Sequence, residues 1–137
     1  MDNQFVWDVR VYYEDADAGG VVYHSNYLNF MERARTEWLR SLGFEQTELK
    51  TEMGVMFVVR ALKLEYKKPA YFNDALSVIT TIVKTGRSLL EFEQTIIRGD
   101  ELLTEATVAL VCVDANQFKP TPIPTKIRNA MQIMEPE

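Results

Sequence analysis

The sequence contains one long stretch with helical periodicity, between Asn26 and Leu42. Its apolar side chains recur at spacings of three and four residues, at Tyr27, Phe30, Met31, Ala34, Trp38 and Leu42. Charged residues occupy most positions between them, at Glu32, Arg33, Arg35, Glu37 and Arg40. This pattern predicts an amphipathic helix of about 16 residues, capped by Ser25 or Asn26 and ended by Gly43 in a left-handed conformation. The rest of the chain has to cover the apolar face of this helix.

The segments around this helix have the period of β-strands. One segment precedes the helix, from Phe5 to Tyr13, and four follow it, at 56–66, 76–84, 88–98 and 102–114. The short connections between consecutive strands favour their pairing as antiparallel neighbours, although the connection at 69–74 is long enough to cross to a strand further away in the sheet. Short helices are expected at 45–51 and 124–134. The sequence therefore predicts a single α+β domain over residues 1–137, with a five-stranded antiparallel sheet wrapped around one long central helix.

The last predicted strand is apolar on both faces between Val108 and Val113. Such a segment is typical of a strand that lies between two layers, whereas one helix covers only one face of a sheet. We therefore expect a homo-oligomer, a homodimer or a homotetramer, that covers the second face.

The composition excludes several classes of function. The 15 Lys and Arg against 20 Asp and Glu give a net charge of −5, so we expect no nucleic-acid partner. The chain has one cysteine and one histidine, too few for an internal disulfide or a zinc site, and we expect no metal and no cofactor. We find no apolar run long enough for a membrane span and no signal peptide, which favours a cytoplasmic location.

An acidic loop with two glycines leads directly into the predicted helix, between Asp15 and Tyr27. The start of a helix presents N–H groups without intrahelical acceptors and carries a partial positive charge. A thioester carbonyl held near His24 would have its oxygen stabilised there, with its carbon facing the carboxylate of Asp17. Asp17 would then act either as a nucleophile or as a general base on water. Gly19 and Gly20 would allow the substrate to approach the backbone closely.

The run from Tyr12 to Tyr27, followed by Phe30 to Leu39, closely resembles the YbgC-type acyl-CoA thioesterases of the 4-hydroxybenzoyl-CoA thioesterase family. The resemblance continues through shorter segments, at 57–60, 65–66, 69–70 and 111–114. It implies the hot-dog fold, which agrees with the predicted order of elements, and hydrolysis of acyl-CoA thioesters. It further implies that Asp17 is the catalytic carboxylate and that His24 contributes its backbone N–H, with its side chain as a second contribution.

Further residues are candidates for binding the substrate. The loop residues are Gly19, Gly20, Val21 and Tyr23, and the candidates for the phosphate-bearing end of coenzyme A are Arg60, Arg87 and Ser88. A turn at Gly86 would let backbone and guanidinium groups meet a phosphate. Glu14 and Asp15 are interpreted as structural or solvated, because two more carboxylates would disfavour the ionised form of Asp17. Cys112 is interpreted as a buried apolar residue.

The resemblance also implies partners and leaves alternatives open. Proteins of this type form dimers or tetramers with sites between subunits, are associated with the Tol-Pal envelope system while cytoplasmic, and in some cases meet acyl carrier protein. A non-catalytic module that binds acyl groups or acyl carrier protein in cell-envelope maintenance is one alternative. A hot-dog dehydratase is another, but the lone His24 beside a thioesterase-like motif disfavours it.

Overall fold

A computed structural model describes residues 4–131 of the chain and shows the predicted arrangement of one long helix and one sheet. The strands are β1 (Gln4–Arg10), β2 (Val55–Tyr66), β3 (Ala75–Thr85), β4 (Leu89–Arg98) and β5 (Glu101–Asp114). The helices are α1 (Asn26–Ser41), α2 (Gln46–Glu48) and α3 (Thr125–Met131), with short turns η1 (Tyr13–Asp15) and η2 (Leu49–Met53). The end of the predicted last helix, beyond Met131, lies outside the described residues. Within residues 4–131 no helix has the length and apolar character that crossing a membrane requires.

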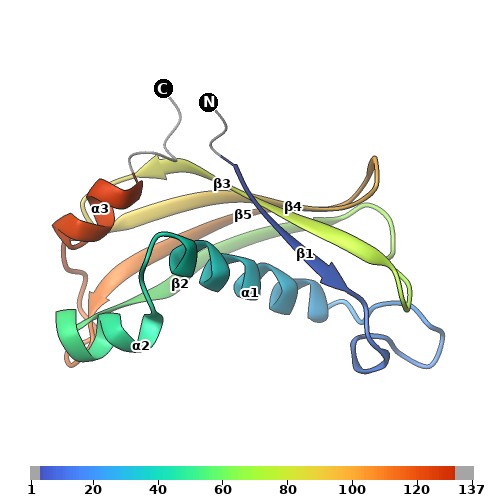
Figure 1. Cartoon of the computed structure of the whole chain (residues 1–137), viewed down its shortest axis with the longest axis horizontal. Helices are drawn as coiled ribbons and strands as arrows, with labels where there is room; N and C mark the ends of the chain where they lie inside the picture. Colours follow the sequence, from blue (N-terminus) through green and yellow to red (C-terminus); the bar gives the residue numbers. More distant parts are fainter. Residues whose placement is uncertain (1–3, 132–137) are drawn as a thin grey trace.

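The five strands form one antiparallel sheet in the order β1-β3-β4-β5-β2. β2 therefore lies at one edge, whereas β3, the next strand in the chain, pairs with β1 near the other edge. The connection at 67–74 has to cross one end of the sheet, as the wider crossing expected there requires. Figure 1 shows the sheet curving over α1.

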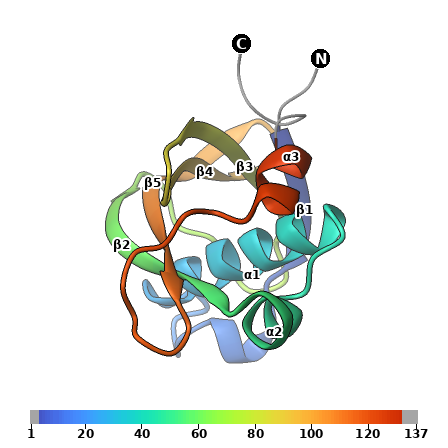
Figure 2. The ribbon, with the colours of Figure 1, turned by 90° about the vertical axis from the view of Figure 1, so that its left-hand side faces the viewer.

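The core lies between α1 and the concave face of the sheet. The buried side of α1 consists of Tyr27, Phe30, Met31, Ala34, Trp38 and Leu39. Alternate residues of β4 face them, and the rings of Trp38 and Phe92 meet edge to face with centroids 5.1 Å apart. Burial of each large apolar side chain contributes about 1.5–3 kcal/mol relative to exposure, so this contact holds the helix in the curve of the sheet (Figure 2).

The first strand ends earlier than its alternating pattern predicts. β1 ends at Arg10, and the chain then enters the turn η1, where Oδ2 of Asp15 accepts a 2.9 Å hydrogen bond from the N–H of Tyr12. Tyr13, which the alternation assigned to the buried face, is 83% exposed. Asp15 is buried and holds this turn, so its structural interpretation agrees with the structure.

The ends of α1 follow the prediction in part. Ser25 precedes the helix but its side chain makes no capping hydrogen bond, and the side chain of Asn26 instead donates to the carbonyl oxygen of Asp15 at 2.9 Å. The side-chain cap expected at this end is therefore not formed. Gly43 follows the helix with φ +96°, the left-handed conformation that favours glycine.

Residues 108–113 are buried within one chain, apart from the partly exposed Val111. The chain folds back after β5, so that Val113 pairs with Pro120. The apolar surface expected on β5 lies instead along the edge strand β2, where Val59, Leu62 and Tyr66 are 53%, 42% and 50% exposed.

Candidate active site

The loop between β1 and α1 folds as a tight hairpin that starts at Asp17. The N–H of Asp17 donates to the carbonyl oxygen of Val21 at 2.9 Å, and the N–H of Gly20 donates to that of Asp17 at 3.0 Å. Gly20 adopts φ +80°, a conformation that other residues rarely take. The backbone around Asp17 is therefore fixed by its own turn.

The carboxylate of Asp17 lies on the exposed side of this turn. Its Oδ1 accepts a 2.8 Å hydrogen bond from the N–H of Gly19. A Cβ atom at Gly19 would lie 3.3 Å from the same oxygen, so a glycine leaves the room that this close approach needs. The turn thus orients the carboxylate through a hydrogen bond from its own backbone.

The crossing segment at 67–74 holds the hairpin against the end of the sheet. The N–H of Val22 donates to Ala70 and the N–H of Phe72 donates to Gly20, both at 2.9 Å. The N–H of Ala70 in turn donates to the hydroxyl of Tyr27, in the first turn of α1, at 2.9 Å. Hairpin, crossing segment and helix start therefore form one hydrogen-bonded unit.

Two exposed residues at the start of α1 have N–H groups without an acceptor within the described part of the chain. The N–H of Tyr23 donates to Asp15 and that of Asn26 donates to Tyr23, whereas those of His24 and Ser25 bond to no residue among 4–131. Both residues are exposed. Since the N–H groups at the start of a helix point outward and carry its partial positive charge, these two can donate hydrogen bonds to an oxygen of a ligand.

A cleft of about 310 Å³ lies beside these N–H groups. Its walls combine the helix start with the end of β2 and the crossing segment, through Val22, His24, Tyr27, Tyr66, Lys67, Lys68 and Pro69. The hydroxyl of Tyr66 donates to the carbonyl oxygen of His24 at 2.8 Å. The cleft therefore offers a mostly apolar space next to the N–H groups of His24 and Ser25.

The remaining predicted substrate-binding residues lie away from the hairpin and the start of α1. Arg60 is exposed at the register shift of the edge strand β2, between Val59 and Ala61. Arg87 and Ser88 lie in the β3–β4 turn beside α3, at the opposite end of the sheet from the hairpin (Figure 1). The carbonyl oxygen of Arg87 accepts hydrogen bonds from the N–H of Ile123 and from Arg128. The loop candidates Asp17, Gly19, Gly20, Val21, Tyr23 and His24 therefore lie on one segment, of which His24 lines the cleft, whereas Arg60, Arg87 and Ser88 lie elsewhere in the chain.

Arg35, one of the charged residues between the apolar positions of α1, is partly buried. It lines a second cleft of about 220 Å³ between α1 and the sheet, and its Nη1 donates to Oε1 of the fully buried Gln94 at 2.8 Å. Burial lowers the pKa of Arg35. In the sequence, its position four residues after the buried Met31 could have indicated that Arg35 is partly buried. No feature of the local sequence indicates the contact between Tyr66 and His24.

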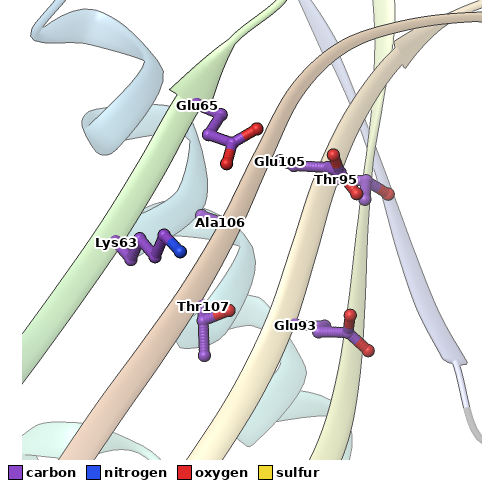
Figure 3. Close-up of a pocket in the computed structure, with 7 residues that line it drawn as sticks. All are labelled: Lys63, Glu65, Glu93, Thr95, Glu105, Ala106 and Thr107. Carbon is purple, nitrogen blue, oxygen red and sulfur yellow. The ribbon is translucent and has the colours of Figure 1, made fainter.

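The outer face of the sheet carries a separate polar groove of about 140 Å³. Figure 3 shows side chains from β2, β4 and β5 around it, and these are Lys63, Glu65, Glu93, Thr95, Glu105, Ala106 and Thr107. None of the candidate residues of the hairpin lines this groove. In the range 4–131 no three side chains of His, Cys, Asp or Glu gather as a metal ion would require.

Comparison with known proteins identifies the family. Residues 19–105 match the model of the thioesterase superfamily, a segment that begins just after Asp17. An acyl-CoA thioesterase YbgC of Haemophilus influenzae is 45% identical over 95% of this chain and 96% of its own length. An acyl-CoA thioester hydrolase YbgC of Escherichia coli is 49% identical over 90% of this chain and 92% of its own.

A solved structure shows the same fold. The crystal structure of a probable thioesterase from Bartonella henselae superposes with a TM-score of 0.84, at 35% identity, and the match covers 88% of this chain and 99% of that one. The predicted resemblance, the hot-dog fold and the class of thioester hydrolases are thereby confirmed. The chain belongs to the thioesterase superfamily.

Proposed function

We propose that the chain hydrolyses acyl-CoA thioesters at the start of α1, with Asp17 as the catalytic carboxylate. The observation that carries the proposal is that one short loop holds an oriented carboxylate and the N–H groups of His24 and Ser25, which find no acceptor among residues 4–131. The names of the relatives from H. influenzae and E. coli support acyl-CoA as the substrate.

In the proposed reaction the thioester oxygen accepts hydrogen bonds from the N–H groups at His24 and Ser25. These donors stabilise the negative charge that develops on the oxygen, a contribution of about 3 kcal/mol for one well-placed donor. Gly19 and Gly20 leave the backbone of the hairpin accessible, and Val21 and Tyr23 flank the acyl group. The imidazole of His24 is exposed and packs against the ring of Tyr23, with centroids 4.4 Å apart, at the edge of the same site.

Asp17 can act in two ways that differ in their intermediates. As a general base it takes a proton from water, the water oxygen attacks the carbonyl carbon, the C–S bond breaks, and the coenzyme A thiolate recovers the proton. As a nucleophile its carboxylate attacks the carbon, the thiolate leaves, and water then hydrolyses the resulting anhydride. Mass spectrometry of the protein during turnover separates the routes, because only the second adds an acyl group to Asp17.

We also propose that the protein is a homodimer or homotetramer whose sites are completed between subunits. β2 is an edge strand of 12 residues with exposed apolar side chains, and such an edge is a template for pairing with another chain. Arg60 lies on this edge. A second subunit would also be needed to bring Arg87 and Ser88 toward the phosphates of coenzyme A at the hairpin.

A cytoplasmic location, a link to the Tol-Pal system and contact with acyl carrier protein stay predictions from the resemblance. Contact with acyl carrier protein is tested by measuring binding of the purified proteins to each other.

The proposed activity is tested by release of free thiol from a panel of short-chain, long-chain and aromatic acyl-CoA thioesters. Hydrolysis of one class with release of coenzyme A supports the proposal. Lack of turnover across the panel, together with tight binding of acyl carrier protein, would instead support a non-catalytic binding module. Interconversion of hydroxyacyl and enoyl thioesters without thiol release would indicate a dehydratase.

A further inference from the structure

Tyr66, the last residue of β2, ties the sheet edge to the start of α1. Its hydroxyl donates a 2.8 Å hydrogen bond to the carbonyl oxygen of His24, a residue 42 positions away in the sequence. Because the contact joins two distant segments, it depends on the tertiary fold and not on local helix geometry.

The carbonyl oxygen of His24 receives no hydrogen bond from the first turn of the helix. The N–H of Asn26 donates to Tyr23, and the N–H of Leu28 donates to Ser25 at 3.2 Å. Among residues 4–131, the Tyr66 hydroxyl is the donor that reaches this oxygen. The orientation of the carbonyl group is therefore set by Tyr66.

The ring of Tyr66 is held in place although half of the residue is exposed. It packs edge to face on Tyr27, with ring centroids 5.3 Å apart, and Tyr27 is only 3% exposed. The Tyr27 hydroxyl is itself fixed by the N–H of Ala70. Burial, and then the neighbouring Tyr27, raise the pKa of Tyr66, so its hydroxyl keeps the proton that it donates.

The hydrogen-bonded oxygen belongs to the same planar peptide group as the N–H of Ser25. A hydrogen bond at the oxygen fixes the plane of that group, and it also polarises the N–H and makes it a stronger donor. The N–H of Ser25 has no acceptor in the described part of the chain.

We propose that Tyr66 is a positioning residue, which orients and polarises the peptide group between His24 and Ser25 so that its N–H meets the carbonyl oxygen of the bound thioester. The inference rests on the proposed function. A donor fixed before the reaction needs no reorientation when charge develops on the oxygen. Its contribution therefore grows toward the transition state and affects kcat more than KM.

The test compares Tyr66→Phe with Tyr71→Phe in the full chain. Both residues are about half exposed, at 50% and 47%, but no hydrogen bond of the Tyr71 hydroxyl is found within the described residues. We expect Tyr66→Phe to lower kcat by roughly three- to tenfold, with KM within about twofold of the parent. The Ser25 amide resonance should shift in the substrate-free variant, and Tyr71→Phe should change neither measurement.

A parental kcat in Tyr66→Phe, an unmoved Ser25 amide resonance, or an equal loss in Tyr71→Phe would overturn the positioning role. In each of these cases the parent chain still hydrolyses the thioester, so the proposed function stands. A parent chain that releases no thiol would overturn both proposals, and the two failures are thereby distinguished.

Discussion

The backbone N–H of Gly19 lies 2.8 Å from Oδ1 of Asp17, and a Cβ atom on Gly19 would lie 3.3 Å from the same oxygen. The glycine therefore both orients the carboxylate and leaves it room. A side chain at this position would push the carboxylate by a few tenths of an ångström, at the group that the proposed chemistry depends on most.

The variant Gly19→Ala should accordingly lose activity while it remains folded. We expect kcat to fall roughly three- to tenfold, because small misplacements of a catalytic group are costly. Steady-state kinetics of thiol release measures the effect. Gly99→Ala is the matched control, since Gly99 lies in the β4–β5 turn with φ +61° and has no atom within 4 Å of its Cβ position. That variant should lose about 1 kcal/mol of stability and keep the parental kcat; equal kcat values for the parent and Gly19→Ala would contradict the role of Gly19.

A second expectation concerns the pair formed by the partly buried Arg35 and the fully buried Gln94. The side-chain amide of Gln94 also donates to the Met31 carbonyl oxygen at 3.0 Å and to the Thr80 hydroxyl at 2.9 Å. Gln94→Leu should destabilise the fold by about 2 kcal/mol, because it leaves a partly buried guanidinium without its acceptor. Denaturant unfolding measures the loss.

The double variant Arg35→Met/Gln94→Leu should recover much of that stability, because no unpaired charge remains. Thr80→Val, which removes one acceptor of the Gln94 amide, should cost about 1 kcal/mol. A double variant less stable than Gln94→Leu would show that the charge is not the source of the loss.

Cys112 gives the fold a dependence on alkaline pH. The residue is buried, and burial raises the pKa of its thiol to about 11. The unfolded chain loses this proton near pH 9, before the folded chain does, so the free energy of unfolding falls as pH rises from about 9 to 11. At pH 11 the loss from this group approaches roughly 2 kcal/mol.

The measurement compares the unfolding free energy of the parent and Cys112→Ala across this range, because tyrosines and lysines contribute equally to both. The difference between the two chains should be constant below pH 8 and shrink above pH 9. A difference that stays constant to pH 11 would show that the folded thiol titrates normally.

The edge strand β2 should control assembly. Val59→Lys places a charge on an apolar edge residue that is 53% exposed, and Val6→Lys does so at 52% exposure on β1, the opposite edge. We expect sedimentation analysis to show that Val59→Lys shifts the oligomer toward monomer, while Val6→Lys leaves it intact. The reverse result would place the interface on β1.

The sequence predicted the elements that local periodicity controls and missed the contacts that only the tertiary fold creates. The spacing of Phe30, Met31 and Ala34 defined α1, and alternation in β4 defined its buried face. The partial burial of Arg35 was not predicted, although the residue lies four positions after the buried Met31.

The predicted end of β1 was wrong because the Asp15 carboxylate binds the N–H of Tyr12 and turns the chain there. The alternation of apolar and polar residues does not reveal such a turn. At the site, the motif around Asp17 and His24 was visible as a run of residues. The contact of Tyr66 with His24 was not, because β2 reaches the helix start only through the order of the sheet.

The most direct measurement is thiol release by Asp17→Asn on the acyl-CoA that the parent hydrolyses best. Asparagine keeps an oxygen for the Gly19 N–H, so the hairpin and the melting temperature should be preserved. We expect kcat to fall by at least about a hundredfold, because asparagine neither attacks a carbonyl nor takes a proton from water. A folded Asp17→Asn variant that turns over at the parental rate would contradict the assignment of the carboxylate.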